Sequence, residues 1–342
     1  MYWIIVIFCL GILVALHELG HYAMARATGM KVHRFSVGFG PALFSFTSPK
    51  TGTVFQLGML PLGGFVQILG MNPFEEDAFT DPASYQRKPV WQRALVILAG
   101  PLSNYLITLA VIFGLLTLAG MPHEVNEARV GTVTPDSPAA QAGLRANDRI
   151  LEIDGTPHTT WDALVTTLRQ SPEQTLHLMI ERDGRRFFAP ITPKNVDGIG
   201  LIGITMPTTN VSLPPGEAAA FAWHKSLSLI ENTLSSLAAL ISGKDKTVQA
   251  VGPPGIVKMG HQQLATGAAA FLSYLAYISL MLFLFNLLPI PALDGGRTLF
   301  LLFELITRKP VNRKFDAALN TIFFLLLMGA VLIVSIREIF FG

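Results

Sequence analysis

Four stretches of the sequence are apolar over about the length that a helix needs to cross a lipid bilayer. A helix that rises 1.5 Å per residue spans the hydrocarbon core with about 20 residues. Only 14% of the 342 residues are charged, whereas soluble domains average about 25%, so a cytosolic globule is excluded, and so is a disordered chain. The sequence therefore predicts an α-helical polytopic membrane protein with four transmembrane helices, at residues 2–25, 94–118, 268–288 and 319–335.

The first stretch has a cleaved signal peptide as its alternative. A signal peptide begins with a basic region, which this sequence lacks, and His17, Glu18 and His21 interrupt the apolar run. We therefore expect a retained helix. The lone Cys9 cannot form an internal disulfide, and a net charge of +2 is too small to indicate nucleic acid as a partner.

Basic residues indicate which connections lie in the cytoplasm. The connection 26–93 and the turn before the last span are rich in them, and cytoplasmic loops carry an excess of Lys and Arg. We therefore expect both termini and the segment 121–262 on the extracytoplasmic side. The residues concerned are Lys31, Arg34, Lys50, Arg87, Lys88, Arg308, Lys309, Arg313 and Lys314.

Residues 121–205 have the pattern of a soluble α+β domain inserted between the second and third spans. We expect strands at 130–133, 150–153 and 176–180, because these runs are β-branched or alternate in polarity. Asp-Gly pairs at 154–155 and 183–184 are turn signals. A helix is expected over 161–169.

Part of this domain resembles a PDZ domain of the permuted bacterial type. The resemblance is carried by SPAAQAGL at 137–144, NDRI at 147–150 and the following Asp-Gly pair. Asn147 departs from the pattern, which usually has glycine there, but asparagine tolerates the left-handed conformation. A PDZ groove binds an extended peptide as an added strand; a passive spacer is the alternative. The groove is expected at Val130, Gly131, Leu164 and Leu168.

Two further segments have patterns of their own. Within 206–265, one apolar helical stripe predicts a helix that lies either in the membrane interface or against the protein's own spans. In the cytoplasmic connection, strand-like runs at 53–58 and 64–68 are separated by Pro61 and Gly63, which predicts a membrane-associated β-hairpin. The stripe consists of Trp223, Leu227, Ile230, Leu234, Leu237 and Ile241.

The motif HELGH at residues 17–21 lies inside the first apolar stretch. Positions i and i+4 share one helix face, so His17 and His21 can hold one metal ion. Glu18 follows the first ligand and is close enough to take a proton from water at the metal. Buried, hydrogen-bonded histidines are the alternative, but ionisable groups in a membrane helix are costly and usually functional.

Catalytic zinc takes three protein ligands and leaves one position open. Asp294 directly follows the third span, at the same cytoplasmic end as the two histidines. Its alternative role is the N-cap of a short apolar helix expected over 298–307. His33, Cys9 and Glu304 are less suited by position, as are the histidines near or within the external domain, His123, His158 and His177.

HELGH together with NLLPIPALDGG at 286–296 resembles the site-2 protease family of intramembrane zinc metalloproteases, in its bacterial RseP type. SVGFGP at 36–41, PLGGF at 61–65, GPLSN at 100–104 and VGPPGI at 251–256 extend the likeness over essentially the whole chain. Some relatives carry two PDZ domains, whereas this sequence has room for one. The implied parts are a first core half at 1–120, the PDZ domain at 121–205, a linker at 206–265 and a second core half at 266–342.

The resemblance implies a Zn²⁺ ion bound by His17, His21 and Asp294, with Glu18 as the catalytic carboxylate. It also implies that Asn286 contacts the substrate backbone and that the stretch around Gly63, Gly64 and Phe65 belongs to the membrane-dipping β-element. Pro289 and Pro291 interrupt the third helix, which leaves room for an extended substrate.

The expected activity is hydrolysis of peptide bonds within single-span membrane proteins, such as anti-sigma factors or remnant signal peptides. The expected location is the bacterial cytoplasmic membrane, with the lipid bilayer and a possible PDZ peptide as further partners. A metal or proton transporter is one alternative, but the second and fourth stretches carry few polar residues. An inactive PDZ scaffold is another, although His17, Glu18, His21 and Asp294 are all present.

Overall fold

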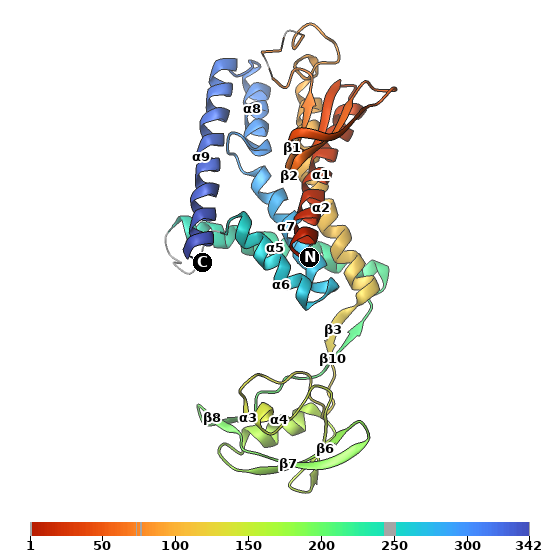
Figure 1. Cartoon of the computed structure of the whole chain (residues 1–342), viewed down its shortest axis with the longest axis vertical. Coiled ribbons are helices and arrows are strands. Elements are labelled where there is room, and N and C mark those ends of the chain that lie inside the picture. The colour runs from red at the N-terminus through yellow and green to blue at the C-terminus, as the bar shows by residue number, and fades with distance from the viewer. Residues whose placement is uncertain (1, 73, 76, 243–250, 342) are drawn as a thin grey trace. The chain divides into compact units, whose positions relative to one another are not determined.

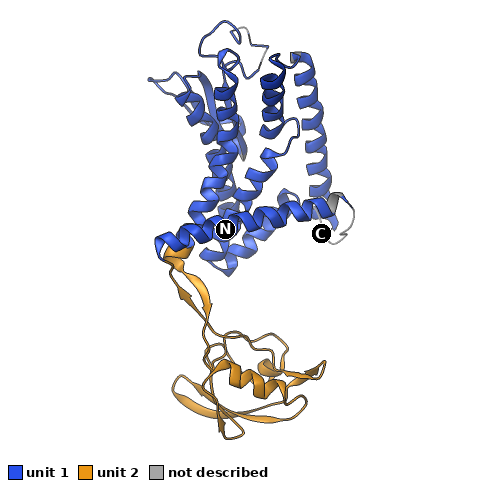
Figure 2. Cartoon of the chain, turned by 180° about the vertical axis from the view of Figure 1, so that it is seen from behind, with its two compact units in different colours: residues 1–115, 214–342 blue, residues 116–213 orange. Residues whose placement is uncertain are grey.

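The computed structural model describes residues 2–72, 74–75, 77–242 and 251–341 (Figure 1). The chain forms two compact units, Met1–Leu115 with Pro214–Gly342 and, inserted between them, Leu116–Leu213 (Figure 2). We call these unit 1 and unit 2. The side chains of Pro61, Ile241 and Arg313, on which sequence predictions drew, lie outside the described side chains.

Among the residues that the structure describes, four helices are long and apolar enough to cross a membrane, and they overlap the four apolar stretches. The short helix α8 begins at Asp294, before the predicted residue 298. In unit 1, the beginning of α1 and the end of α9 lie at one end, and α8 lies at the other (Figure 1). The helices of unit 1 are α1 (Tyr2–Ala27), α2 (Val90–Gly114), α5 (Pro215–Ile241), α6 (Pro253–Thr266), α7 (Ala268–Leu287), α8 (Asp294–Thr307) and α9 (Arg313–Phe341).

Small and polar residues hold α1, α2 and α7 together. Gly20 of α1 packs so tightly on the Ala99 carbonyl of α2 that an added Cβ would clash with it. The hydroxyl of Thr108 donates to the Ala276 carbonyl at 3.1 Å, and that of Ser279 donates to the Asn104 carbonyl at 2.9 Å. Such bonds stabilise helix pairs where apolar burial offers little driving force.

The predicted β-hairpin is wrong in its pairing. Runs 53–58 and 64–68 belong to one strand, β2 (Val54–Ile68), which pairs antiparallel with β1 (Val32–Thr47). The ladder is irregular, and Phe35 of β1 lies opposite both Phe55 and Val66 of β2. Gly38, Gly40 and Pro41 interrupt the alternating pattern of β1, which hid this strand from a reading by periodicity.

Aromatic rings attach this sheet to α1. The ring of Tyr22 meets the rings of Phe35 and Phe55 edge-on, with centroids 5.7 and 5.5 Å away. The far part of β1 exposes large apolar side chains instead, including Leu43 at 65% and Phe44 at 63%. A sheet with such a surface is suited to contact lipid.

Helix α5 buries small residues rather than the predicted stripe. Ala218, Ala222 and Ser226 are buried, whereas Trp223, Leu227 and Leu234 are between 42% and 48% exposed. The helix nevertheless lies against α2, because the ring of Trp223 meets the ring of Tyr105 edge-on with centroids 6.1 Å apart. The stripe therefore packs in part on the protein's own spans, and its exposed part keeps the pattern of an interfacial helix.

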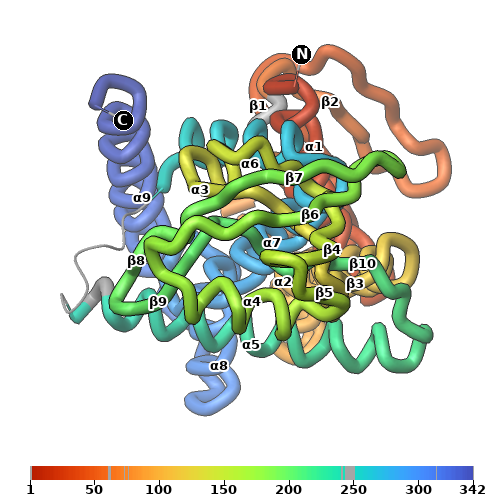
Figure 3. Tube along the Cα trace, turned by 90° about the horizontal axis from the view of Figure 1, so that it is seen from below, coloured from red at the N-terminus to blue at the C-terminus, as the bar shows by residue number. Residues whose placement is uncertain are grey.

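Unit 2 is built on a four-stranded sheet with the order β5-β4-β6-β7, seen in Figure 3 beside helix α4. The predicted helix 161–169 and the strands at 150–153 and 176–180 are confirmed. The elements of unit 2 are β3 (Met121–Glu124), α3 (Pro138–Gln141), β4 (Arg149–Ile153), β5 (Thr156–Pro157), α4 (Trp161–Arg169), β6 (Leu176–Arg182), β7 (Arg185–Ile191), β8 (Lys194–Val196), β9 (Ile199–Leu201) and β10 (Thr208–Val211). In the sequence, a π-helical turn (Leu115–Ala119) directly follows α2.

The predicted strand at 130–133 is wrong, because this run makes only an isolated bridge at Val133 within the described chain. Val130 bonds to Asp148 and Gly131 to Thr205, so the run is extended without a continuous ladder. Asn147 has a φ of 71°, which is the left-handed conformation expected at this departure from the PDZ pattern. The buried Asp148 accepts hydrogen bonds from Arg182, which raises the pKa of that guanidinium.

Candidate metal centre

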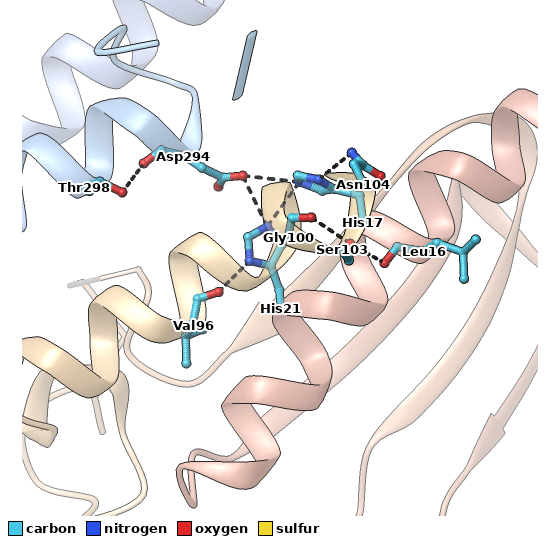
Figure 4. Close-up of polar contacts among 9 residues, drawn as sticks. All are labelled: Leu16, His17, His21, Val96, Gly100, Ser103, Asn104, Asp294 and Thr298. Carbon is cyan, nitrogen blue, oxygen red and sulfur yellow. Dashed lines mark hydrogen bonds and ion pairs between the residues drawn. The ribbon is translucent and has the colours of Figure 1, made fainter. Parts of the chain in front are cut away.

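Three side chains from the two ends of the chain converge at one point in unit 1 (Figure 4). Nε2 of His17 and Nε2 of His21 lie 3.2 and 3.3 Å from Oδ2 of Asp294. The two Nε2 atoms are 3.2 Å apart. The imidazoles come from α1 and the carboxylate from the first residue of α8, so the predicted ligand trio is brought together.

This triangle fits a tetrahedral zinc ion. Ligands 2.0–2.1 Å from zinc at tetrahedral angles lie about 3.3–3.4 Å apart, close to the three distances found. Oδ2 of Asp294 is buried and has no hydrogen-bond partner of acceptable geometry among the described residues. An orphaned carboxylate oxygen facing two imidazole nitrogens is the arrangement that a cation satisfies.

The N-cap alternative for Asp294 is wrong. The residue at the N-cap of α8 is Leu293, and the carboxylate of Asp294 points toward the histidines instead. Its backbone carbonyl accepts a hydrogen bond from the Thr298 hydroxyl at 3.0 Å. Asp294 therefore starts the helix through its backbone and leaves its side chain free to bind a metal.

Helix α2 orients both imidazoles. Nδ1 of His21 donates to the Val96 carbonyl at 2.8 Å, which leaves Nε2 as the free ligand atom. Gly100 packs directly on the His21 ring, where an added Cβ would clash. The turn of α2 around Val96 and Gly100 therefore fixes the position of the His21 ring.

Asn104 of α2 orients the imidazole of His17. Its Nδ2 lies 3.1 Å from Nδ1 of His17, and its Oδ1 is buried without a partner among the described residues. A histidine that binds metal through Nε2 carries a proton on Nδ1 and needs an acceptor there. Because amide orientation is an assignment, rotating the amide by 180° satisfies both Oδ1 and Nδ1. The sequence signal for Asn104 was a polar residue in an apolar stretch.

Glu18 lies beside the edge of β2. An added Cβ at Gly64 would lie 3.2 Å from its Cγ, and its carboxylate interacts with the backbone of Val66. Glu18 is half-buried and directly follows His17 in the sequence. The structure thus brings the predicted catalytic carboxylate, the metal ligands and the predicted β-element together.

The other residues predicted to bind substrate lie at the end of α7, in the loop that follows it and on β2. Asn286 lies in the last turn of α7, and Pro289 and Pro291 lie in the loop that leads to Asp294. Gly63 has a φ of 93°, and its position leaves no room for a Cβ beside the Phe39 ring. Phe65 stacks on that same ring, with centroids 6.3 Å apart.

A cavity of about 610 Å³ extends from the edge of β2 on the side of α8. Residues 65–68 of β2 line one side, and Arg297 and Phe300 of α8 line another. Arg93 and Glu304 also line this cavity and form an ion pair with each other. Nη1 of Arg93 donates to Oε2 of Glu304 at 3.0 Å, and Nη2 donates to Oε1 at 2.5 Å. Glu304 therefore binds Arg93, which explains why it is absent from the ligand trio.

We predict that Glu304→Gln destabilises unit 1. Arg93 is buried, and breaking a buried ion pair costs about 3–5 kcal/mol because one charge loses its partner. Thermal unfolding of the purified protein in detergent should show a midpoint lowered by several degrees. Replacing both partners (Arg93→Met with Glu304→Leu) should recover most of the loss, while the exposed Glu217→Gln serves as control. An unchanged midpoint for Glu304→Gln would show that the pair contributes nothing.

Unit 2 contains a smaller groove of about 150 Å³ between α4 and residues 200–204. Leu168, Trp161 and Val165 line it. Val130 and Leu164 are fully buried in the core of unit 2 instead. Gly131 approaches the Met206 backbone, where an added Cβ would clash.

Comparison with known proteins matches the model of "Peptidase family M50" to residues 5–330. A Clostridium perfringens protein named as a candidate zinc metalloprotease is 35% identical, covering 100% of this chain and 99% of its own. The regulator of sigma-W protease RasP of Bacillus subtilis is 30% identical, covering 96% of each chain. Among solved structures, the PDZ domain of an SdrC-like protein from Listeria monocytogenes has 26% identity and a TM-score of 0.22, covering 25% of this chain and 93% of that one.

The match covers nearly the whole chain, and the metal centre assembles from the motifs that carried the resemblance. A further relative, from Geobacillus kaustophilus, is named "Zinc metalloprotease RasP" and is 30% identical, covering 96% of this chain and 95% of its own. The residues found here fit zinc. The chain therefore belongs to peptidase family M50, the site-2 protease family, and is a membrane-embedded zinc metalloprotease.

Proposed function

We propose that this protein hydrolyses peptide bonds within the transmembrane segments of single-span membrane proteins. The observation that carries this proposal is the position of the metal centre. Its ligands come from α1, an apolar helix long enough to span a membrane, and from α8, which directly follows the α7 span. Substrate bonds that reach it must lie at the depth of the membrane.

Zinc at this centre would polarise the scissile carbonyl and lower the pKa of water from its bulk value to about 7. The carboxylate of Glu18 accepts the proton of the attacking water and later gives it to the leaving nitrogen. His21 and His17 keep their Nε2 atoms available because Val96 and Asn104 occupy their Nδ1 atoms. The contacts of Glu18 thus support proton transfer, and those of His17 and His21 support metal binding.

A helical substrate must unwind, because its peptide bonds are occupied by its own hydrogen bonds. Residues 64–68 pair with β1 on one side, and residues 65–68 face the cavity on the other. We infer that the unwound stretch adds to this edge as a strand, beside Glu18. Asn286 binds the substrate backbone, and the break of helix between Leu287 and Asp294 leaves room for the extended chain.

The protein lies in the bacterial cytoplasmic membrane with both termini and unit 2 on the extracytoplasmic side. Support comes from the basic residues of the connection 26–93 and of the turn before α9, because such residues are in excess on the cytoplasmic side of a membrane. One relative is named as a regulator of sigma-W protease, so anti-sigma factors are the substrates to test first, and remnant signal peptides second. The groove of unit 2 takes an extended peptide of the substrate's external part.

Metal removal tests the proposal. The purified protein is placed in liposomes with a single-span substrate, and the products are measured by mass spectrometry. We expect a chelator to stop cleavage and added zinc to restore it, with both product ends inside the transmembrane segment. Cleavage that persists after zinc removal is verified, or that occurs only outside the segment, would contradict it.

A further inference from the structure

The loop that presents Asp294 contains a residue in an unfavourable conformation. Ala292 has a φ of 76°, in the left-handed region that residues with a Cβ rarely occupy. It lies two positions before Asp294. Immediately after Asp294, Gly295 and Gly296 pack closely on the backbone carbonyls of Leu287 and Ile290. The backbone at the start of α8 therefore has little freedom to change its conformation. The direction of the Asp294 side chain therefore depends on the conformation of Ala292.

One side chain from another helix holds this residue. Oδ1 of Asn320, on α9, accepts a hydrogen bond from the Ala292 N–H at 2.7 Å. Nδ2 of Asn320 donates to the backbone carbonyl of Asp316 at 2.8 Å and to its Oδ1 at 2.6 Å. Two acceptors on the Nδ2 side fix the amide orientation, so Oδ1 must face Ala292.

A merely structural explanation is that Asn320 satisfies a polar group near the membrane. Backbone N–H groups there need a partner, and any acceptor would serve. That explanation does not account for the choice of residue 292, whose φ is the unfavourable one in this loop. It also does not account for the position of α9. The most apolar stretch of this helix has no residue buried inside the protein, yet the helix directs the amide of Asn320 at the loop that carries Asp294.

We propose that Asn320 is a positioning residue for the metal ligand Asp294. By holding Ala292 in the left-handed conformation, it aims the Asp294 carboxylate at His17 and His21. The proposal rests on Asp294 being a zinc ligand, and Asp294→Ala tests that role separately. It makes α9, which contributes no ligand to the trio, part of the support of the metal centre.

The test compares three variants by zinc affinity, measured by competition with a chromophoric chelator. Asn320→Leu removes the acceptor at similar size, and we expect a loss of about 10–100-fold, as for other residues that orient metal ligands. Ala292→Gly alone should bind zinc nearly as the wild type, because glycine adopts positive φ without a steric penalty. The double variant should recover most of the affinity that Asn320→Leu loses.

Cleavage kinetics add a second readout. Asn320 would act through Asp294 and not on substrate, so Asn320→Leu should lower kcat with little change in KM. The matched control is Asn232→Leu on the exposed face of α5, which should change neither quantity. Unchanged zinc affinity in Asn320→Leu overturns the proposal, and so does a double variant that stays as weak as Asn320→Leu.

Ala292→Val covers the case in which Asn320→Leu does not fold. Valine is β-branched and strongly disfavoured at positive φ, so this variant opposes the same conformation with Asn320 intact. We expect it to lower zinc affinity by a similar factor. Wild-type affinity in Ala292→Val would show that the conformation of residue 292 does not control the ligand.

Discussion

The Glu18→Gln variant is expected to bind zinc as the wild type does and to cleave about 10²–10⁴-fold more slowly. Glutamine has nearly the shape of glutamate, so the packing against Gly64 and the place beside Val66 remain. It cannot accept a proton, and general acid–base catalysis typically contributes a factor of this size. Zinc content per chain and single-turnover cleavage of a single-span substrate measure the two halves of the prediction.

A matched substitution separates this effect from a general one. Glu231→Gln makes the same chemical change on the exposed surface of α5 and should leave zinc content and rate unchanged. If Glu18→Gln cleaves within a few-fold of the wild-type rate, another group moves the proton. If it loses zinc as well, Glu18 supports the metal site and the loss of rate says nothing about proton transfer.

The metal centre was predictable from the sequence because each of its two parts has a signal within a short stretch of the chain. HELGH needs only helical periodicity to bring His17 and His21 onto one face. Asp294 could be chosen because it directly follows an apolar stretch whose cytoplasmic end lies at the level of the histidines. In the structure the three ligand atoms lie within 3.3 Å of one another.

The contacts that support the ligands were less accessible. Val96 binds His21 through a backbone carbonyl, which no residue pattern marks. The pair Arg93 and Glu304 is separated by 211 positions, and each residue alone has the pattern of a charge at a helix end. Asn320 meets Ala292 only because the loop and α9 cross, and a positive φ at alanine has no sequence signature.

Strand pairing was the weakest prediction for a related reason. Glycine and proline suppress the alternation that identifies a strand. Those within β1 hid that strand, and Pro61 and Gly63 within β2 made one strand look like two. Gly38 and Gly58 are in fact sites of close backbone approach, where an added Cβ would meet the opposite strand. Gly38, one of the residues that hid β1, is thus also a residue that lets the two backbones pack closely.

The Asp294→Ala variant is expected to lose zinc, with an affinity lowered more than about 100-fold. Residues that only orient ligands contribute 10–100-fold, and here a ligand itself is removed. Competition with a chelator measures the loss, and Asp294→Asn should fall between alanine and wild type because its amide oxygen is a neutral, weaker ligand. The exposed turn variant Asp183→Asn is the control.

Folding should not explain the result. Because the N-cap of α8 is Leu293 and the Asp294 carboxylate is aimed at His17 and His21, alanine removes no cap. It also removes a buried acid whose Oδ2 has no hydrogen-bond partner in the described chain. The metal-free variant should therefore unfold at a temperature no lower than the metal-free wild type. Full zinc affinity in Asp294→Ala would mean that the convergence of the three side chains serves some purpose other than binding the metal.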